Sequence, residues 1–341
     1  PFEGCPRFNL KRVLKEAENM GYEMKVGTEL EFFFFLLDEN NQPTLMSHDY
    51  AGYFDMDPDD KGADARREIV IFLEQMGYEV EASHHEVASG QQEITFKYTD
   101  ALKAADAALT FKWVVKAIAK KHGLHATFMP KPIEGDSGSG MHTNQSLFQG
   151  ERNIFFDERD PLKLSQDAYS YIAGLLKHAR YFAAVTNPLV NSYKRLIPGY
   201  EAPVYLSWSG ANRSALIRIP VQRGSNTRIE LRCPDTAANP YLAFAVMLKA
   251  GLDGIKRQAK PPRPIEENVF EMSPTQKRRA GITSLPCDLN EAVQLMKKSE
   301  LVRNALGDHI YCQYINAKEQ EWESYRMAVH PWEHHHYLKK Y

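Results

Sequence analysis

Near the start of the chain lies the segment MKVGTELEFFFFLL, residues 24–37, which is followed by the turn-like DENN at 38–41. Its run of phenylalanines between aliphatic residues favours a long β-strand. Side chains alternate along a strand, so Glu29 and Glu31 share one face. The opposite, apolar face consists of Met24, Val26, Leu30, Phe32 and Phe34. Two neighbouring carboxylates repel each other unless a cation lies between them. A solvated polar face is the alternative for this pair taken alone.

Helices and strands are interleaved along the rest of the chain. Apolar periodicity and capping residues predict helices over 10–20, 62–76, 101–122, 166–185 and 240–256. Further strands are expected over 124–128, 141–148, 214–219 and 226–232. The proline-rich segment 260–264 is a linker candidate, and the last 55 residues read as short amphipathic helices with an aromatic tail. Because the strands carry charge on one face, we expect an α+β fold with a mainly antiparallel sheet.

Composition narrows the classes of function. The 341 residues include 42 basic and 44 acidic side chains, a net charge of −2, so neither nucleic acid nor an anionic membrane is expected as a direct partner. The longest apolar run, Phe32–Leu37, is far shorter than the roughly 20 residues of a membrane span. The four cysteines form no CxxC pair, which favours a reducing, cytoplasmic setting.

Two further polar clusters could carry chemistry. Glu86 and Glu93 bracket a turn at Gly90, so the two carboxylates could return to one place. The neighbouring His84 and His85 are as compatible with a structural role as with a ligand role. His142, Asn144 and Ser146 share one face of a predicted strand entered through the GSG loop 138–140. Such a loop lets backbone N–H groups approach an anion, although a lone histidine there is more often structural.

A fourth cluster contains arginines. Arg228, Glu230 and Arg232 share one strand face, while Ile229 and Leu231 face inward. Fixed guanidinium groups suit carboxylate and phosphate ligands, with surface salt bridges as the alternative. Together, the carboxylates, the imidazole and the arginines predict a hard-cation site of oxygen ligands that faces an anionic substrate, and Mg²⁺ prefers such ligands. No GxxxxGK[ST] motif is present, so an ordinary P-loop enzyme is disfavoured.

Ordered motifs along the chain match a known family. They are GTELEF (27–32), HHEVA (84–88), FMPKP (128–132), GSGMH (138–142), NSYKRLIPGYEAP (191–203), NRS (212–214), IRIP (217–220), RIELR (228–232) and AANPY (237–241). On these motifs the chain resembles the catalytic domain of type I (bacterial) glutamine synthetase over essentially its whole length. The resemblance implies a curved, mainly antiparallel sheet that forms a funnel-shaped active site and is backed by helices. It implies one catalytic domain over 1–341, with 265–341 as its helical C-terminal part. The family's N-terminal β-grasp-like domain, which supplies an Asp to a neighbouring subunit's site, is expected to be absent from this chain.

The resemblance also implies roles for individual residues. Ligands of one Mg²⁺ (or Mn²⁺) would be Glu31, Glu86 and Glu93, and ligands of a second would be Glu29, His142 and Glu230. Glutamate and ammonium would contact Ser137, Gly138, Arg195, Glu201, Arg213 and Arg232. ATP would contact Glu81, Phe96, Ser146, Arg213, Arg218 and Arg228. The resemblance implies that Glu201 is the flap carboxylate. It also implies that Glu201, Arg213 and Arg218 act in catalysis. Ser137 stands where the family usually has Asn.

The activity implied by the resemblance is ATP-dependent ligation of ammonia to the γ-carboxylate of glutamate. ATP first forms γ-glutamyl phosphate, and ammonia then displaces phosphate to give glutamine. A γ-glutamyl-amine or polyamine ligase is one alternative, and a non-catalytic nucleotide- or glutamine-binding regulatory protein or inactive fragment is another. The family forms dodecamers of two stacked hexameric rings, so a homo-oligomer is expected. Its C-terminal tail, here residues 321–341, contacts a nitrogen regulator in some members.

Overall fold

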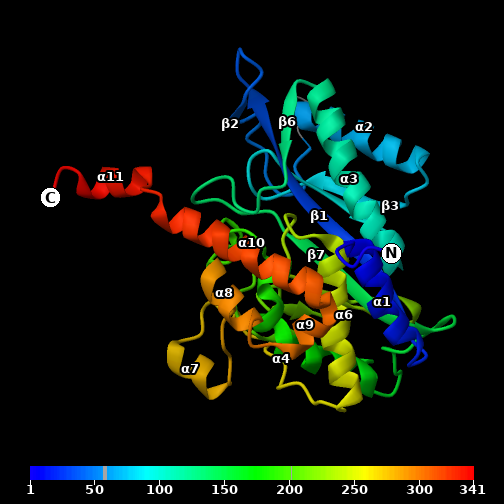
Figure 1. Cartoon of the computed structure of the whole chain (residues 1–341). Helices are drawn as coiled ribbons and strands as arrows, with labels where there is room; N and C mark the ends of the chain where they lie inside the picture. Colours follow the sequence, from blue (N-terminus) through cyan, green and yellow to red (C-terminus); the bar gives the residue numbers. More distant parts are fainter. Residues whose placement is uncertain (57–59, 201) are drawn as a thin grey trace.

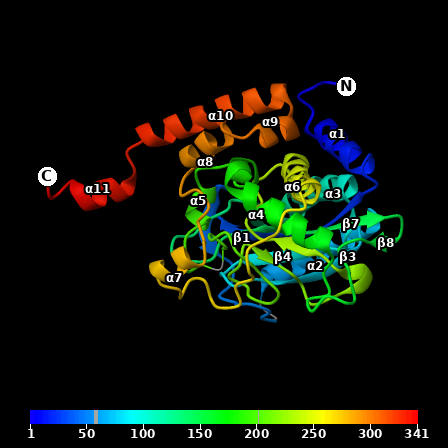
Figure 2. The same cartoon turned by 90° about the horizontal axis from the view of Figure 1, so that it is seen from below.

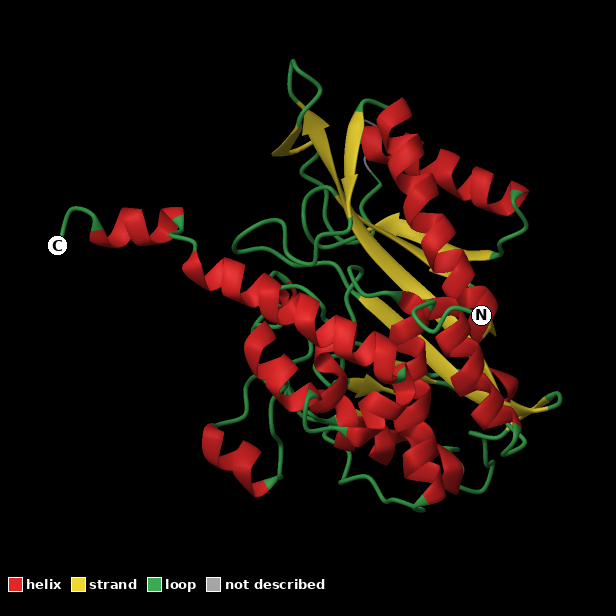
Figure 3. Cartoon of the chain, viewed as in Figure 1, coloured by secondary structure: helices red, strands yellow, loops and turns green. Residues whose placement is uncertain are grey.

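The computed structural model describes residues 1–56, 60–200 and 202–341. It is an α+β fold in which a large, mostly antiparallel sheet is backed by helices (Figures 1 and 3). The helices are α1 (Pro6–Glu18), α2 (Lys61–Gln75), α3 (Ala101–Lys121), α4 (Gln166–Thr186), α5 (Ser192–Arg195), α6 (Pro240–Lys256), α7 (Pro274–Arg279), α8 (Leu289–Met296), α9 (Glu300–Leu306), α10 (Asp308–Met327) and α11 (Pro331–Tyr337). The strands are β1 (Glu23–Leu37), β2 (Pro43–Ser47), β3 (Val80–His85), β4 (Gln91–Phe96), β5 (Thr99–Asp100), β6 (Leu124–Thr127), β7 (Met141–Gln149), β8 (Arg152–Asn153), β9 (Trp208–Ser209), β10 (Ile217–Arg218) and β11 (Ile229–Leu231).

Strand β1 organises the sheet. The main strand order is β3-β4-β1-β7-β11-β10-β9, and β1 also pairs with β2, β5 and β6. Every pairing is antiparallel except that of β9 with β10. The register sets Glu29 opposite His142 and Glu31 opposite Glu93. The predicted antiparallel sheet is therefore confirmed, and its pairing brings distant polar residues to one face.

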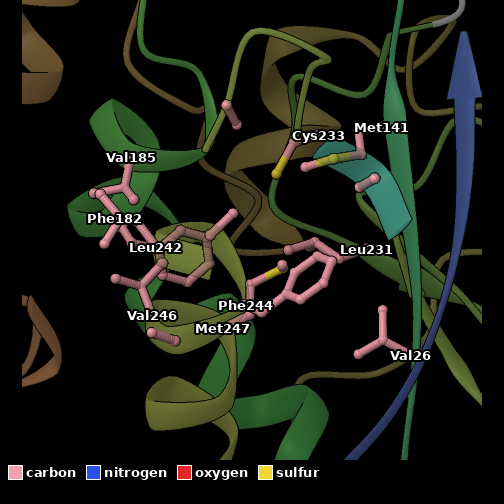
Figure 4. Packing of buried hydrophobic residues seen from close by; sticks show 14 of the residues in the cluster. Val26, Met141, Phe182, Val185, Leu231, Cys233, Leu242, Phe244, Val246 and Met247 are labelled. Carbon is pink, nitrogen blue, oxygen red and sulfur yellow. The ribbon is translucent and has the colours of Figure 1, made fainter. Parts of the chain in front are cut away.

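The apolar face of β1 enters the main core as predicted. Val26, Leu30, Phe32 and Phe34 are all fully buried there, and Phe33 and Phe35 form a smaller cluster with Ala88 on the other face. Figure 4 shows side chains of β1, β7, β11 and α6 meeting in this core, and Figure 2 shows α1, α6 and α10 on one side of the strands. The helices thus cover one face of the sheet.

Most predicted elements are confirmed, and several boundaries differ. Strands β3 and β4 were not predicted as strands, and residues 308–327 form one long helix where short helices were expected. Strands β10 and β11 are shorter than the predictions 214–219 and 226–232. The Asn212 side chain accepts a hydrogen bond from the Ser214 amide and bends the chain before β10, and Pro220 follows β10.

The proline-rich segment 260–264 packs against the sheet and does not separate two domains. The Trp208 Nε1 donates to the Pro262 carbonyl at 2.7 Å, and the Ile265 amide donates to the Trp208 carbonyl at 2.9 Å. Helices α7 to α11 lie within residues 265–341. Helix α11 projects away from the body at the C-terminus (Figures 1 and 2). Within the described ranges, no helix is long and apolar enough to cross a membrane.

Helices α4 and α6 cross through glycines. A Cβ on Gly254 would lie 2.0 Å from the Ser170 carbonyl oxygen and 2.9 Å from the Gly174 Cα. Since both are backbone atoms, the helices would have to move apart. We expect Gly254→Ala to lower the free energy of unfolding by about 3 kcal/mol, as overpacking does in dense cores.

Urea unfolding of the parent protein and of Gly254→Ala measures this difference in the free energy of unfolding. Gly52→Ala is the matched control, because its Cβ would meet no atom of the described residues within 4 Å. The control should stay within about 0.5 kcal/mol of the parent protein. Equal unfolding midpoints for Gly254→Ala and Gly52→Ala would contradict the prediction.

Candidate active site

The polar face of the sheet opens into a cavity of about 810 Å³. All six predicted metal ligands line it, although they come from four separate segments of the chain. Strand β1 supplies Glu29 and Glu31, the β3–β4 hairpin supplies Glu86 and Glu93, and β7 and β11 supply His142 and Glu230. Strand alternation fixes which side chains face the cavity, and strand pairing brings them together.

One compact group consists of Glu29, His142 and Glu230. His142 Nδ1 lies 3.1 Å from Glu29 Oε2 and 3.7 Å from Glu230 Oε1. Asn144 Nδ2 donates to the other Glu29 oxygen at 2.9 Å. One ligand-type atom from each of the three residues lies within 4.8 Å of the others, as a shared cation requires. These three residues are the ligand set that the family resemblance implies for one ion.

The pKa values in this group reflect burial and crowding. Burial acts to raise the pKa of Glu29, but hydrogen bonds from His142 and Asn144 outweigh it and lower that pKa to about 2. Burial, together with the nearby Glu29 charge, raises the pKa of Glu230. Burial also raises the pKa of Glu31, which lies beside this group and is the predicted ligand of the other ion. A divalent cation would favour the ionised form of all three carboxylates.

A second compact group consists of His84, Glu86 and Glu93. His84 Nε2 lies 3.3 Å from Glu93 Oε1, and its Nδ1 lies 3.7 Å from Glu86 Oε1. The family resemblance implies Glu31 as a ligand of this ion, and the sequence left His84 open between ligand and structural roles. Glu31 is the register partner of Glu93 on β1, and its Oε2 accepts hydrogen bonds from the Gly140 amide at 2.8 Å and from Gln91 at 3.1 Å.

Arginines border the two groups. Arg218 Nε lies 2.7 Å from Glu230 Oε2, and Arg232 Nε donates to Glu230 Oε1 at 3.2 Å. Arg195 is almost fully buried, and its guanidinium donates to the carbonyls of Cys233 at 2.8 Å and Arg232 at 3.2 Å. Its Nε finds no acceptor among the described residues. The cavity therefore offers fixed positive charge beside its carboxylates.

The loop over Arg195 requires its glycines. A Cβ on Gly138 would lie 2.3 Å from the Pro130 carbonyl oxygen, and one on Gly140 would lie 2.5 Å from an Arg195 nitrogen. The loop therefore packs directly on the arginine. Ser137 and Gly138 both line the cavity.

The donor set fits divalent cations. Six carboxylate or imidazole side chains converge, and hard cations prefer such oxygen-rich sites. Glu230 Oε2 is buried and forms an ion pair with Arg218 Nε at 2.7 Å. Glu230 therefore presents buried negative charge to the cavity beside Glu29 and His142.

The remaining predicted residues are placed as follows. Arg213, Arg218 and Arg232 line the cavity with Arg195. Ser146 and Arg228 lie further along the same sheet face, and Arg228 Nε donates to Asn144 Oδ1 at 3.1 Å.

Glu81 is exposed on β3, beside a register irregularity. Phe96 points into the core against Phe111, away from the cavity, because it lies an odd number of residues from Glu93 on β4. Glu201 lies outside the described residues.

Several cavity residues were not predicted from the sequence. Tyr53 and Phe54 line the cavity, and the Phe54 ring stacks on His84 with the centroids 4.2 Å apart. Gln91 bridges Glu31 and the Gly138 carbonyl. Gln91 stands two residues before Glu93, so strand alternation would have placed it on the site face. No local pattern marks Tyr53 or Phe54, which reach the site through a loop.

This fold and site define an enzyme-like centre in which two acidic groups suited to divalent cations face buried arginines. The family model described as "Glutamine synthetase, catalytic domain" matches residues 3–337. A glutamine synthetase of Clostridium saccharobutylicum is 58% identical over 341 residues, which cover 100% of this chain and 77% of that relative. One from Methanosarcina mazei is 58% identical over 338 residues, covering 99% and 76%. The chain belongs to the glutamine synthetase catalytic-domain family.

Solved structures agree with this family assignment. A GmaS structure described as an ADP complex superposes with a TM-score of 0.89 at 34% sequence identity, covering 99% of this chain and 78% of that chain. An apo GmaS structure without ligand gives a TM-score of 0.87 at 36% identity, covering 99% and 77%. The predicted family and fold class are confirmed.

Proposed function

We propose that this chain carries the catalytic site of an ATP-dependent glutamine synthetase, which joins ammonia to the γ-carboxylate of glutamate. The observation that carries the proposal is the convergence of two acidic groups and four arginines on one cavity. Relatives at 56–58% identity over the whole chain bear the name glutamine synthetase, which supports the same activity.

Divalent cations, Mg²⁺ or Mn²⁺, would be held by Glu29, His142 and Glu230 on one side and by Glu31, Glu86 and Glu93, with His84, on the other. When bound, they would neutralise phosphate charge and orient ATP. Hydrogen bonds within the chain hold these side chains in place beforehand: Asn144 fixes Glu29, and the Gly140 amide fixes Glu31. Preorganised ligands need little rearrangement when a cation arrives.

Glutamate would bind between the 137–140 loop and the arginines. A carboxylate is a poor electrophile because its oxygen leaves badly, and phosphorylation by ATP supplies a leaving group. Arg213 and Arg218, which both line the cavity, would stabilise negative charge on the transferring phosphoryl group. Arg195 and Arg232 would hold substrate carboxylates. Ammonium must lose a proton before it attacks. Glu201 remains the predicted flap carboxylate of the ammonium site.

Two other activities remain as outcomes of a test. An amine ligase of the same family is less well supported, because relatives that are 56–58% identical over the whole chain bear the name glutamine synthetase. A non-catalytic nucleotide- or glutamine-binding protein or an inactive fragment is disfavoured by the complete set of acidic ligands. Homo-oligomerisation, regulator contact through the tail and a cytoplasmic location remain predictions.

The test is ADP release in the presence of Mg²⁺, ATP and glutamate, comparing ammonium, methylamine and putrescine. We expect stimulation by ammonium. Stimulation by methylamine or putrescine alone would reassign the chain to an amine ligase. No release with any of the three, from protein that binds Mg·ATP, would favour the binding protein.

A further inference from the structure

A buried charge cluster lies behind the hairpin that carries Glu86 and Glu93. On β3 and β4, His84 and Glu93 form one register pair and face the cavity. The next pair, His85 and Gln92, points to the opposite face and is fully buried. One side of this hairpin therefore faces the cavity, and the other side faces the buried charge cluster.

The cluster consists of His48, Asp49, Asp60 and His85. His48 Nε2 lies 2.7 Å from Asp49 Oδ2 and 2.8 Å from Asp60 Oδ1, and His85 Nε2 lies 3.2 Å from the same Asp49 oxygen. These side chains are at most 5% exposed. Asp60 also caps α2 by accepting the Gly62 amide at 2.7 Å. Segments far apart in sequence are thus joined through one set of ion pairs.

The cluster's groups satisfy one another. The second nitrogen of each imidazole faces a backbone carbonyl: His85 Nδ1 lies 2.6 Å from the Glu86 oxygen, and His48 Nδ1 lies 3.4 Å from the Phe34 oxygen. A carbonyl can only accept, so an N–H on both nitrogens is the consistent state of each ring. Two imidazolium groups then balance two carboxylates. This arrangement is that of a structural charge network, with no nitrogen left for a cation.

Asp49 holds both ends of the loop on which Glu86 lies. Its Oδ1 accepts the Gly90 amide at 2.8 Å, and its Oδ2 binds His85, whose ring in turn contacts the Glu86 carbonyl. Gly90 presses against β1 with φ +74°, and a Cβ there would lie 2.7 Å from the Phe34 carbonyl oxygen. Glycine is therefore required at this position, where the loop packs against β1.

A second connection reaches Glu93 from the same cluster. Arg66 on α2 lies 3.8 Å from Asp60 through its Nη1 and donates to the Gln92 side chain. Gln92 precedes Glu93 on β4. The backbone on either side of the hairpin turn is therefore tied to the cluster.

We propose that Asp49 is a positioning residue, which fixes the 85–90 segment so that Glu86 meets Glu93 and His84 at cation-binding distance. This inference rests on the proposed function, because it requires the acidic group to bind a cation. Residues that orient metal ligands typically contribute 10- to 100-fold to metal affinity. Asp49 would act in this way although it lies outside the cavity lining.

The test is a titration of the full chain with Mn²⁺ alone, measured by isothermal titration calorimetry. We expect Asp49→Asn to weaken Mn²⁺ binding roughly 10- to 100-fold and to speed hydrogen exchange at the Gly90 amide. The matched control is Asp253→Asn, which also breaks an Asp–His pair (Asp253 Oδ2 to His178 Nε2, 2.8 Å) but joins α6 to α4. The control should lower thermal stability and leave Mn²⁺ affinity unchanged.

The outcomes separate the two proposals. A parent protein that binds no Mn²⁺ would overturn the proposed cation site, and the role of Asp49 with it. A parent that binds Mn²⁺ and an Asp49→Asn variant of equal affinity would overturn the positioning role alone. If Asp49→Asn does not fold, His85→Gln replaces it, because Asp49 then keeps its contacts with Gly90 and His48. Unchanged Mn²⁺ affinity in His85→Gln would equally overturn the proposal.

Discussion

Glu230→Gln is expected to lower ammonium-dependent ADP release about 10³-fold, a loss of about 4 kcal/mol in transition-state stabilisation. Glu230 contacts His142 at 3.7 Å, Arg218 at 2.7 Å and Arg232 at 3.2 Å. It therefore connects a cation group with the arginines. Glutamine keeps the side-chain volume but removes the negative charge that both the cation and the arginines require. Glu230→Ala should abolish turnover as well, with a further loss of stability because two guanidinium groups lose their counter-charge.

Steady-state ADP release and Mn²⁺ titration together measure the effect. Glu16→Gln is the control, since Glu16 forms ion pairs with Arg12 and Lys249 away from the cavity. Its turnover should match that of the parent protein. Near-normal turnover in Glu230→Gln would remove Glu230 from the cation site.

Arg195→Lys is expected to raise the KM for glutamate about 100-fold and to change the KM for ATP much less. The Arg195 guanidinium already serves the carbonyls of Cys233 and Arg232 through two different nitrogens. Lysine has one ammonium group, which cannot serve two carbonyls and a substrate carboxylate in the planar geometry of a guanidinium. A loss of roughly 3 kcal/mol in glutamate binding corresponds to this factor.

The control for this variant is Arg180→Lys, because Arg180 pairs with Glu291 at 2.8 Å on α4, outside the cavity lining. Thermal unfolding of both variants separates a local effect from general destabilisation. An unchanged KM for glutamate in folded Arg195→Lys would contradict the assignment of Arg195 to the glutamate site.

The helices show how much secondary structure could be predicted from local sequence patterns. The helix predicted over 240–256 is α6, with Asn239 accepting the amides of Tyr241 and Leu242 as its cap. Caps and apolar periodicity are properties of consecutive residues, so they can be read without a partner. The 308–327 helix was broken into shorter pieces in the prediction because few of its residues are buried, which leaves little periodic signal.

The sequence by itself determined which side chains share a face. Alternation along β1 placed Glu29 and Glu31 opposite the phenylalanines of the core, and alternation along β11 placed Glu230 with Arg228 and Arg232. The resemblance to a family then supplied roles for these residues. Alternation holds for any extended strand whatever its neighbour is.

Only the tertiary structure decided which faces meet. The pairing of β1 with β4 and β7 set Glu31 beside Glu93 and Glu29 beside His142, and the hairpin turned His84 into the cavity and His85 away from it. Asp49 reaches His85 across 36 positions of the chain. Strand register and such distant contacts depend on pairing and loop closure between separate segments, and no local pattern encodes them.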